Sequence, residues 1–98
     1  MSREKEILEL MLNSDNTDVK VIIAEYKYGL DILINDKNEY VRAAVARQGY
    51  GLDKLVNDKY QFVRAAVANQ GYGLDILVND VDYIVRQIAN KKLQELNK

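Results

Sequence analysis

The charged side chains that recur most regularly in this chain are an aspartate and an arginine six residues apart. The spacing occurs three times, in the pairs Asp36 and Arg42, Asp58 and Arg64, and Asp80 and Arg86. A row of three guanidinium groups would suit phosphate, which arginine binds with two parallel hydrogen bonds. Because each arginine follows a carboxylate of its own, we instead expect partly buried ion pairs that serve the structure.

Other reactive chemistry is sparse. The chain has no histidine and no cysteine, so the commonest general base and the thiolate nucleophile are both missing. The Asn-Asp pairs at 35–36, 57–58 and 79–80 offer oxygen ligands, but they lack the alternating acidic residues of a calcium loop. We expect Asp36 and Asp58 to cap helices instead, each with a partner three residues on. The sequence therefore predicts no metal site, no cofactor and no enzymatic activity.

The elements that position these side chains are copies of a 22-residue unit. Residues 29–50 and 51–72 differ at only six of their 22 positions, and residues 7–28 and 73–94 are more divergent copies. A repeat of this length is typical of a stacked array in which no unit buries its apolar face alone. We predict one domain, residues 1–98, made of repeats 7–28, 29–50, 51–72 and 73–94, with the first and last as capping copies.

Each unit is expected to hold two helices. In the third unit, Leu52, Leu55 and Val56 follow a helical spacing over residues 50–57, and a second helix is expected over residues 59–70. Gly71 suits the position that ends this helix, since glycine accepts a positive φ. An all-α chain follows, whose short helices depend on stacking. The tyrosines that precede each Gly-Leu-Asp are expected to pack at the bend between helices: Tyr28, Tyr50 and Tyr72.

The pattern D-x-x-x-x-V-R-x-x-V-A resembles HEAT-type repeats, and more closely the short-repeat variants of bacteria such as leucine-rich repeat variant proteins. The matching residues are Asp36, Val41, Arg42 and Ala46; Asp58, Val63, Arg64 and Ala68; and Asp80, Val85 and Arg86. The resemblance implies a right-handed α-solenoid of about four two-helix HEAT-like repeats. It also implies an aspartate–arginine ladder between neighbouring repeats and a scaffold that binds other proteins through its second helices.

A partner is therefore expected on the surface of the second helices. Tyr60 and Tyr83 replace polar residues of the sister copies, and exposed tyrosine is a common binding anchor. The alanines of this surface either let neighbouring helices approach closely or form a shallow groove, and the sequence leaves both interpretations open. The candidate partner-binding residues are Glu39, Ala43, Arg47, Tyr60, Gln61, Ala65, Asn69, Tyr83 and Gln87.

These features favour a non-enzymatic protein–protein interaction module of bacterial or phage origin. Nucleic-acid binding is an alternative, but it needs a basic stripe, and acidic residues outnumber basic ones 15 to 14, for a net charge of −1. A small inhibitor or adaptor that acts on a host protein for a mobile element is another. Self-association through apolar side chains such as Ile32 and Ile76 is a further one, and the oligomeric state stays open.

The sequence contains no recognisable targeting signal. The first residues lack the apolar stretch and cleavage site of a signal peptide, and no apolar run is long enough to span a bilayer. We therefore expect a cytoplasmic protein with no membrane partner.

Overall fold

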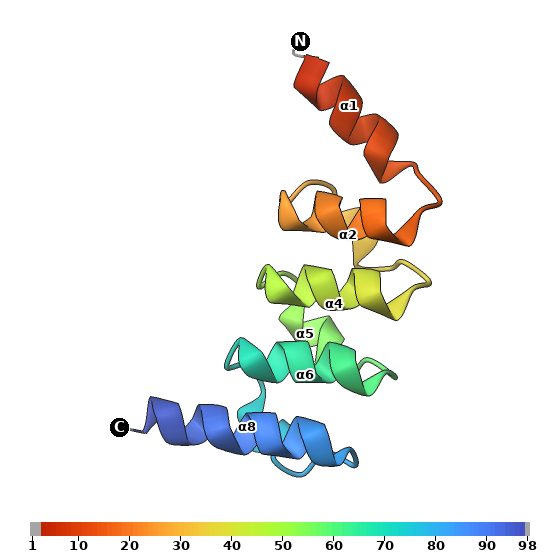
Figure 1. Ribbon diagram of the computed structural model, residues 1–98. Coiled ribbons are helices and arrows are strands. Elements are labelled where there is room, and N and C mark those ends of the chain that lie inside the picture. The colour runs from red at the N-terminus through yellow and green to blue at the C-terminus, as the bar shows by residue number, and fades with distance from the viewer. Residues whose placement is uncertain (1–2, 98) are drawn as a thin grey trace.

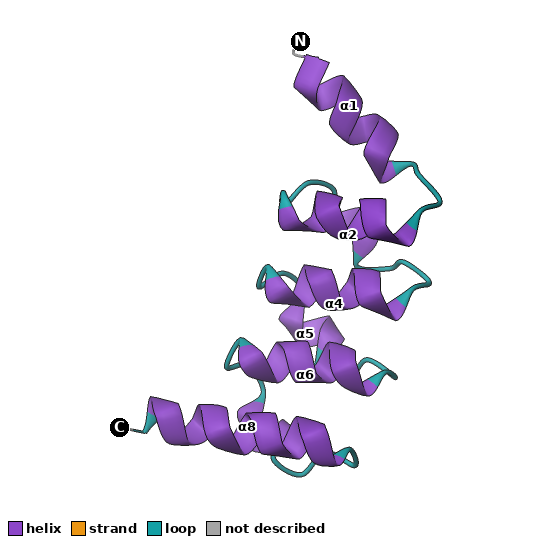
Figure 2. Ribbon diagram, viewed as in Figure 1, coloured by secondary structure: helices purple, strands orange, loops and turns teal. Residues whose placement is uncertain are grey.

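The structure is a computed structural model that describes residues 3–97, and within that range it contains eight helices and no strand (Figure 2). This confirms the predicted all-α class. The longer helices are α2 (Thr17–Glu25), α4 (Glu39–Arg47), α6 (Gln61–Asn69) and α8 (Tyr83–Leu96). They alternate with α1 (Arg3–Leu12) and the one-turn helices α3 (Leu30–Leu33), α5 (Leu52–Leu55) and α7 (Leu74–Leu77).

The longer helices lie side by side in chain order (Figure 1). Contacts join α2 to α4, α4 to α6, and α6 to α8, while α1 packs only on α2. The one-turn helices each touch the longer helices beside them and do not touch one another. The resulting body measures 46 × 27 × 18 Å. No helix in the described part of the chain combines the length and the apolar character needed to cross a membrane.

Valines of the longer helices form the centre of the core. Val41, Val45, Val63 and Val67 are fully buried, and the leucine that ends each one-turn helix is buried against them. A nine-residue helix is marginal by itself in water, so its stability comes from this burial. The core therefore runs through all the units rather than lying at the centre of any one of them.

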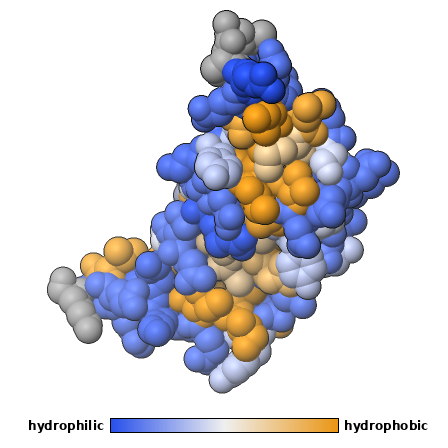
Figure 3. All heavy atoms as spheres, turned by 45° about the horizontal axis from the view of Figure 1, so that its top comes forward, coloured by the Kyte–Doolittle hydropathy of each residue, from blue (hydrophilic) through white to orange (hydrophobic). Residues whose placement is uncertain are grey.

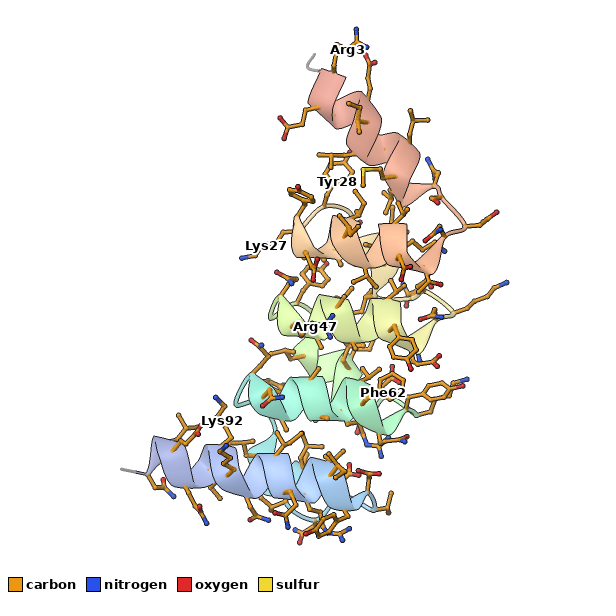
Figure 4. All side chains as sticks on the ribbon, in the orientation of Figure 1. Arg3, Lys27, Tyr28, Arg47, Phe62 and Lys92 are labelled. Carbon is orange, nitrogen blue, oxygen red and sulfur yellow. The ribbon has the colours of Figure 1, made fainter. Side chains whose placement is uncertain are left out.

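Positive-φ residues follow the carboxyl-terminal ends of α2, α4 and α6. Gly49 has φ +77° after α4 and Gly71 has φ +79° after α6, as expected for a glycine at this position. The first unit departs from the pattern, because Lys27 occupies the equivalent place after α2 with φ +60°. A side chain with a Cβ is strained in this left-handed region. Lys27 projects away from the stacked helices (Figure 4), so nothing in its packing offsets the strain.

Replacing Lys27 with glycine is expected to raise the free energy of unfolding by about 1 kcal/mol, since the strain of a left-handed residue disappears. Urea unfolding measures the change. The reciprocal Gly49→Lys substitution is the matched control and is expected to lose a similar amount, because the nearest atom to an added Cβ is 3.8 Å away and leaves room for it. A glycine at position 27 that destabilises the protein would refute this account.

The tyrosines before Gly-Leu-Asp are less buried than expected. Tyr28 is half-buried, and desolvation raises the pKa of its phenol. A hydrogen bond to Glu9 of α1 and the negative charge of Glu9 raise this pKa further. Tyr50 and Tyr72 are 40 % and 41 % exposed. Tyr28 therefore contacts α1 through Glu9, whereas Tyr50 and Tyr72 leave more of their rings open to solvent.

Candidate functional site

The recurring arginines and aspartates meet across neighbouring units. The Arg42 Nε donates to the Asp58 carboxylate at 2.7 Å, and its Nη2 donates to the second carboxylate oxygen at 3.2 Å. Arg64 repeats this fork on Asp80, at 2.7 and 3.0 Å. The four side chains are between 8 % and 13 % exposed. Two charge-assisted pairs thus join α4 to the loop before α6, and α6 to the loop before α8.

Within its own unit, each arginine contacts the backbone rather than the carboxylate. The Arg42 Nη1 donates to the carbonyl oxygen of Asp36 at 2.6 Å, and the Arg64 Nη1 to that of Asp58 at 2.7 Å. The carboxylate six residues before each arginine is therefore engaged by the preceding unit. Asp36, for example, accepts Lys20 of the first unit at 2.9 Å. With Arg42 and Arg64 held by carboxylates, neither is free to bind phosphate.

The same aspartates do not cap the following helices, contrary to our expectation for Asp36 and Asp58. The cap residues are Asn38, Tyr60 and Asp82, two positions later. The aspartates accept the backbone N–H of those cap residues at 2.9–3.0 Å, which fixes the loop before each helix. Each aspartate contacts both a cation of the preceding unit and this N–H, and it lies two residues before the cap residue. The second helices therefore begin later than the sequence predicts.

The ion pairs shift the ionisation of their members. A hydrogen bond from Arg64 lowers the pKa of Asp80 below its ordinary value, against the opposing effect of desolvation. Hydrogen bonds to Asp58 and Asp80 raise the pKa values of Arg42 and Arg64, respectively. Both directions favour the charged forms that the pairs need.

Acid is expected to remove the stability that Asp80 contributes. Its folded pKa is depressed, so the contribution is complete above the unfolded value of about 4 and is lost as the pH falls through the lower folded value. We expect the unfolding free energy of the wild type to fall more steeply below about pH 4 than that of Asp80→Asn. Urea unfolding over a series of pH values measures both slopes, and parallel curves would contradict the assignment.

A group of aromatic rings lies at the amino-terminal ends of α4 and α6. The rings of Tyr40 and Phe62 stack with centroids 4.8 Å apart, and Tyr60 lies tilted against Phe62 at 6.2 Å. The guanidinium of Arg42 lies 5.5 Å from the Tyr60 ring centre. Tyr40 is 58 % exposed, and Figure 4 shows Phe62 at this edge of the stacked helices. We call Tyr40, Tyr60 and Phe62 the aromatic ridge.

The predicted partner-binding residues divide by burial. Ala43 is only 4 % exposed and was wrongly placed on an open surface, because α4 has a longer helix on either side. Ala46 and Ala68 are fully buried, so close approach of helices explains these alanines better than a groove does. The other candidates are exposed, namely Arg47, Gln61, Asn69, Tyr83 and Gln87, or half-buried, namely Glu39, Tyr60 and Ala65.

Two residues of the aromatic ridge were missed as binding candidates, although a signal for them exists. Tyr40 and Phe62 occupy the same position in consecutive repeats, and both are aromatic. Stacked helices place equivalent side chains about 8–10 Å apart at the backbone, which is within reach of two rings. Tyr83 is 61 % exposed on α8 and packs on Arg86 rather than on the aromatic ridge.

Apolar side chains are also exposed elsewhere. Figure 3 shows such side chains gathered in patches on the surface. A shallow groove lies between α1 and α2. It is lined by Glu4, Ile7, Leu8, Met11, Ile22 and Tyr26. Ile32 and Ile76, the side chains considered for self-association, are 59 % and 57 % exposed. They belong to α3 and α7, which lie in different units and make no contact with each other.

Comparison with known proteins identifies no relative of this chain. No protein-family model, curated protein or solved structure matches the chain.

Proposed function

We propose that this chain is a non-enzymatic protein–protein interaction module of the cytoplasm. In this proposal its stacked units form a right-handed α-solenoid of HEAT-like repeats, and a protein partner binds the surface of the second helices. The aromatic ridge is the observation that carries the proposal. Its rings come from two consecutive units and are stacked on one another, yet Tyr40 remains 58 % exposed. Aromatic side chains of this kind supply most of the energy in many interfaces.

The aromatic ridge is also held in place, which favours binding. Arg42 is fixed by its fork on Asp58 while its guanidinium lies against the Tyr60 ring, and Phe62 is held between two tyrosines. Side chains that are ordered before binding lose little conformational entropy when a partner arrives. The exposed Gln61 of α6 lies next to Phe62 in the sequence and adds hydrogen-bonding groups of the kind found at the rim of an interface.

The test is affinity capture from the source organism with quantitative mass spectrometry. The ridge variant carries Tyr40→Ser and Phe62→Ser, and the control variant carries Tyr50→Ser and Tyr72→Ser. Both variants lose two partly exposed rings, one from each of the same two repeats. We expect the ridge variant to lose at least tenfold of the captured partner while the control retains it. Equal retention by two folded variants, with folding checked by circular dichroism, would refute binding at the ridge.

A further inference from the structure

Arg86 of α8 contacts its own backbone as the two paired arginines do, but it makes no hydrogen bond to a carboxylate within the described residues. Its Nη1 donates to the carbonyl oxygens of Asp80 at 2.8 Å and Val81 at 3.1 Å. Arg42 makes the equivalent two contacts in its own unit, at 2.6 and 3.0 Å. The backbone of each unit therefore orients its arginine in the same way, whether or not a carboxylate follows.

The remaining edge of the Arg86 guanidinium, made by Nε and Nη2, has no hydrogen-bond partner within residues 3–97. In Arg42 and Arg64 the same two atoms donate hydrogen bonds to an aspartate sixteen residues further along the chain, one to each carboxylate oxygen. The guanidinium carbon of Arg86 also lies over the Tyr83 ring, 5.7 Å from its centre. Two occupied copies of this arrangement in one molecule thus define the chemistry that the third would accept.

We propose that Arg86 is a docking site for an aspartate or glutamate side chain of the protein partner. The inference rests on the proposed function, which supplies the partner, and adds the chemistry of one contact. The carboxylate would lie across Nε and Nη2 as Asp58 and Asp80 do in their own pairs. A fork of this kind binds a carboxylate with two parallel charge-assisted hydrogen bonds.

The surroundings of Arg86 fit an acidic partner. Within its bounds α8 carries three cations, Arg86, Lys91 and Lys92, against one carboxylate, Glu95. The nearest carboxylates, Asp80 and Asp82 in the loop before α8, are already engaged, Asp80 by Arg64 and Asp82 by backbone N–H groups of α8. Tyr83, Gln87 and Asn90 are exposed on the same helix and offer hydrogen-bonding groups rather than an apolar surface. Complementary charge of this sort selects a partner and its orientation.

A second copy of this chain fits the site less well. The position equivalent to Asp36, Asp58 and Asp80 in the first unit is Ser14, whose hydroxyl accepts the backbone N–H of Asn16. Its side chain can reproduce the local turn but offers no carboxylate to an arginine. The same interaction made head-to-tail between copies would therefore lack its acidic member.

The carboxylate site is tested first with the isolated protein. The probe is N-acetyl-aspartate N-methylamide, titrated at constant ionic strength, and the readout is the Nε–H signal of each arginine by NMR. We expect the Arg86 signal to shift at least fivefold more than that of the exposed Arg47, while Arg42 and Arg64, already paired, stay unchanged. A shift at Arg86 no larger than at Arg47 would overturn the assignment.

The partner contact is tested by the capture experiment with Arg86→Gln, which keeps hydrogen-bond donors but loses the charged fork. We expect at least a fivefold loss of partner, whereas Arg3→Gln on α1, at the opposite end of the molecule, retains it. Undiminished capture by Arg86→Gln would overturn the inference and leave the aromatic ridge as the binding surface. Capture that survives the ridge variant but is lost with Arg86→Gln would refute the ridge and support the Arg86 contact.

Discussion

Replacing Arg64 with alanine is expected to lower the free energy of unfolding by about 3 kcal/mol, because a largely buried carboxylate loses its cation. Arg64 donates two hydrogen bonds to Asp80 and a third to the carbonyl oxygen of Asp58. The Asp80 side chain is only 8 % exposed, so water replaces the lost partner poorly. Urea unfolding followed by circular dichroism measures the difference.

Arg86→Ala is the matched control, because the two arginines share a repeat position and similar backbone contacts. Arg86 makes no hydrogen bond to a carboxylate within the described residues, so its loss is expected to cost about 1 kcal/mol or less. The double substitution of Arg64→Ala with Asp80→Asn is expected to recover part of the stability, since no uncompensated charge then remains. A similar loss for both single arginine variants would show that the carboxylate contact contributes little.

Much of the fold follows from the 22-residue period of the sequence. Equivalent residues recur with glycine at fixed places, which predicts two helices in each unit, and all eight helices of the described chain follow that alternation. The helix boundaries were harder to predict. A four-residue helix such as α5 leaves little periodic signal, and Asp58 has the residue type of a cap although it lies outside the helix.

The partners of the arginines show what a linear sequence leaves out. Arg42 lies six residues after Asp36 and sixteen before Asp58, and the two distances add up to one repeat. Either carboxylate is therefore consistent with the spacing. The direction in which the Arg42 side chain leaves α4 decides between them. It brings the guanidinium to the carboxylate of Asp58 in the next unit, whereas within its own unit the guanidinium contacts only the backbone oxygen of Asp36 and its neighbour. The aromatic ridge depends on the same geometry, because its rings meet only once the helices stack.

Replacing Ala68 with leucine is expected to destabilise the protein by about 3 kcal/mol, because the larger side chain has no space between the helices. Ala68 is fully buried on α6, which has α4 on one side and α8 on the other. If alanines here formed an open groove, an added leucine would instead be tolerated. The midpoint of urea unfolding separates these outcomes.

Asn90→Leu provides the matched control for this substitution. Asn90 occupies the position of Ala68 one repeat later, on α8, and it is exposed because no further helix follows within the described residues. Its side chain only donates to the backbone oxygen of Arg86 at 3.0 Å. Leucine at position 90 is expected to change the free energy of unfolding by less than about 1 kcal/mol, as is usual for exposed positions. A large loss at position 68 with little change at position 90 would show that the alanines exist so that neighbouring helices can pack closely.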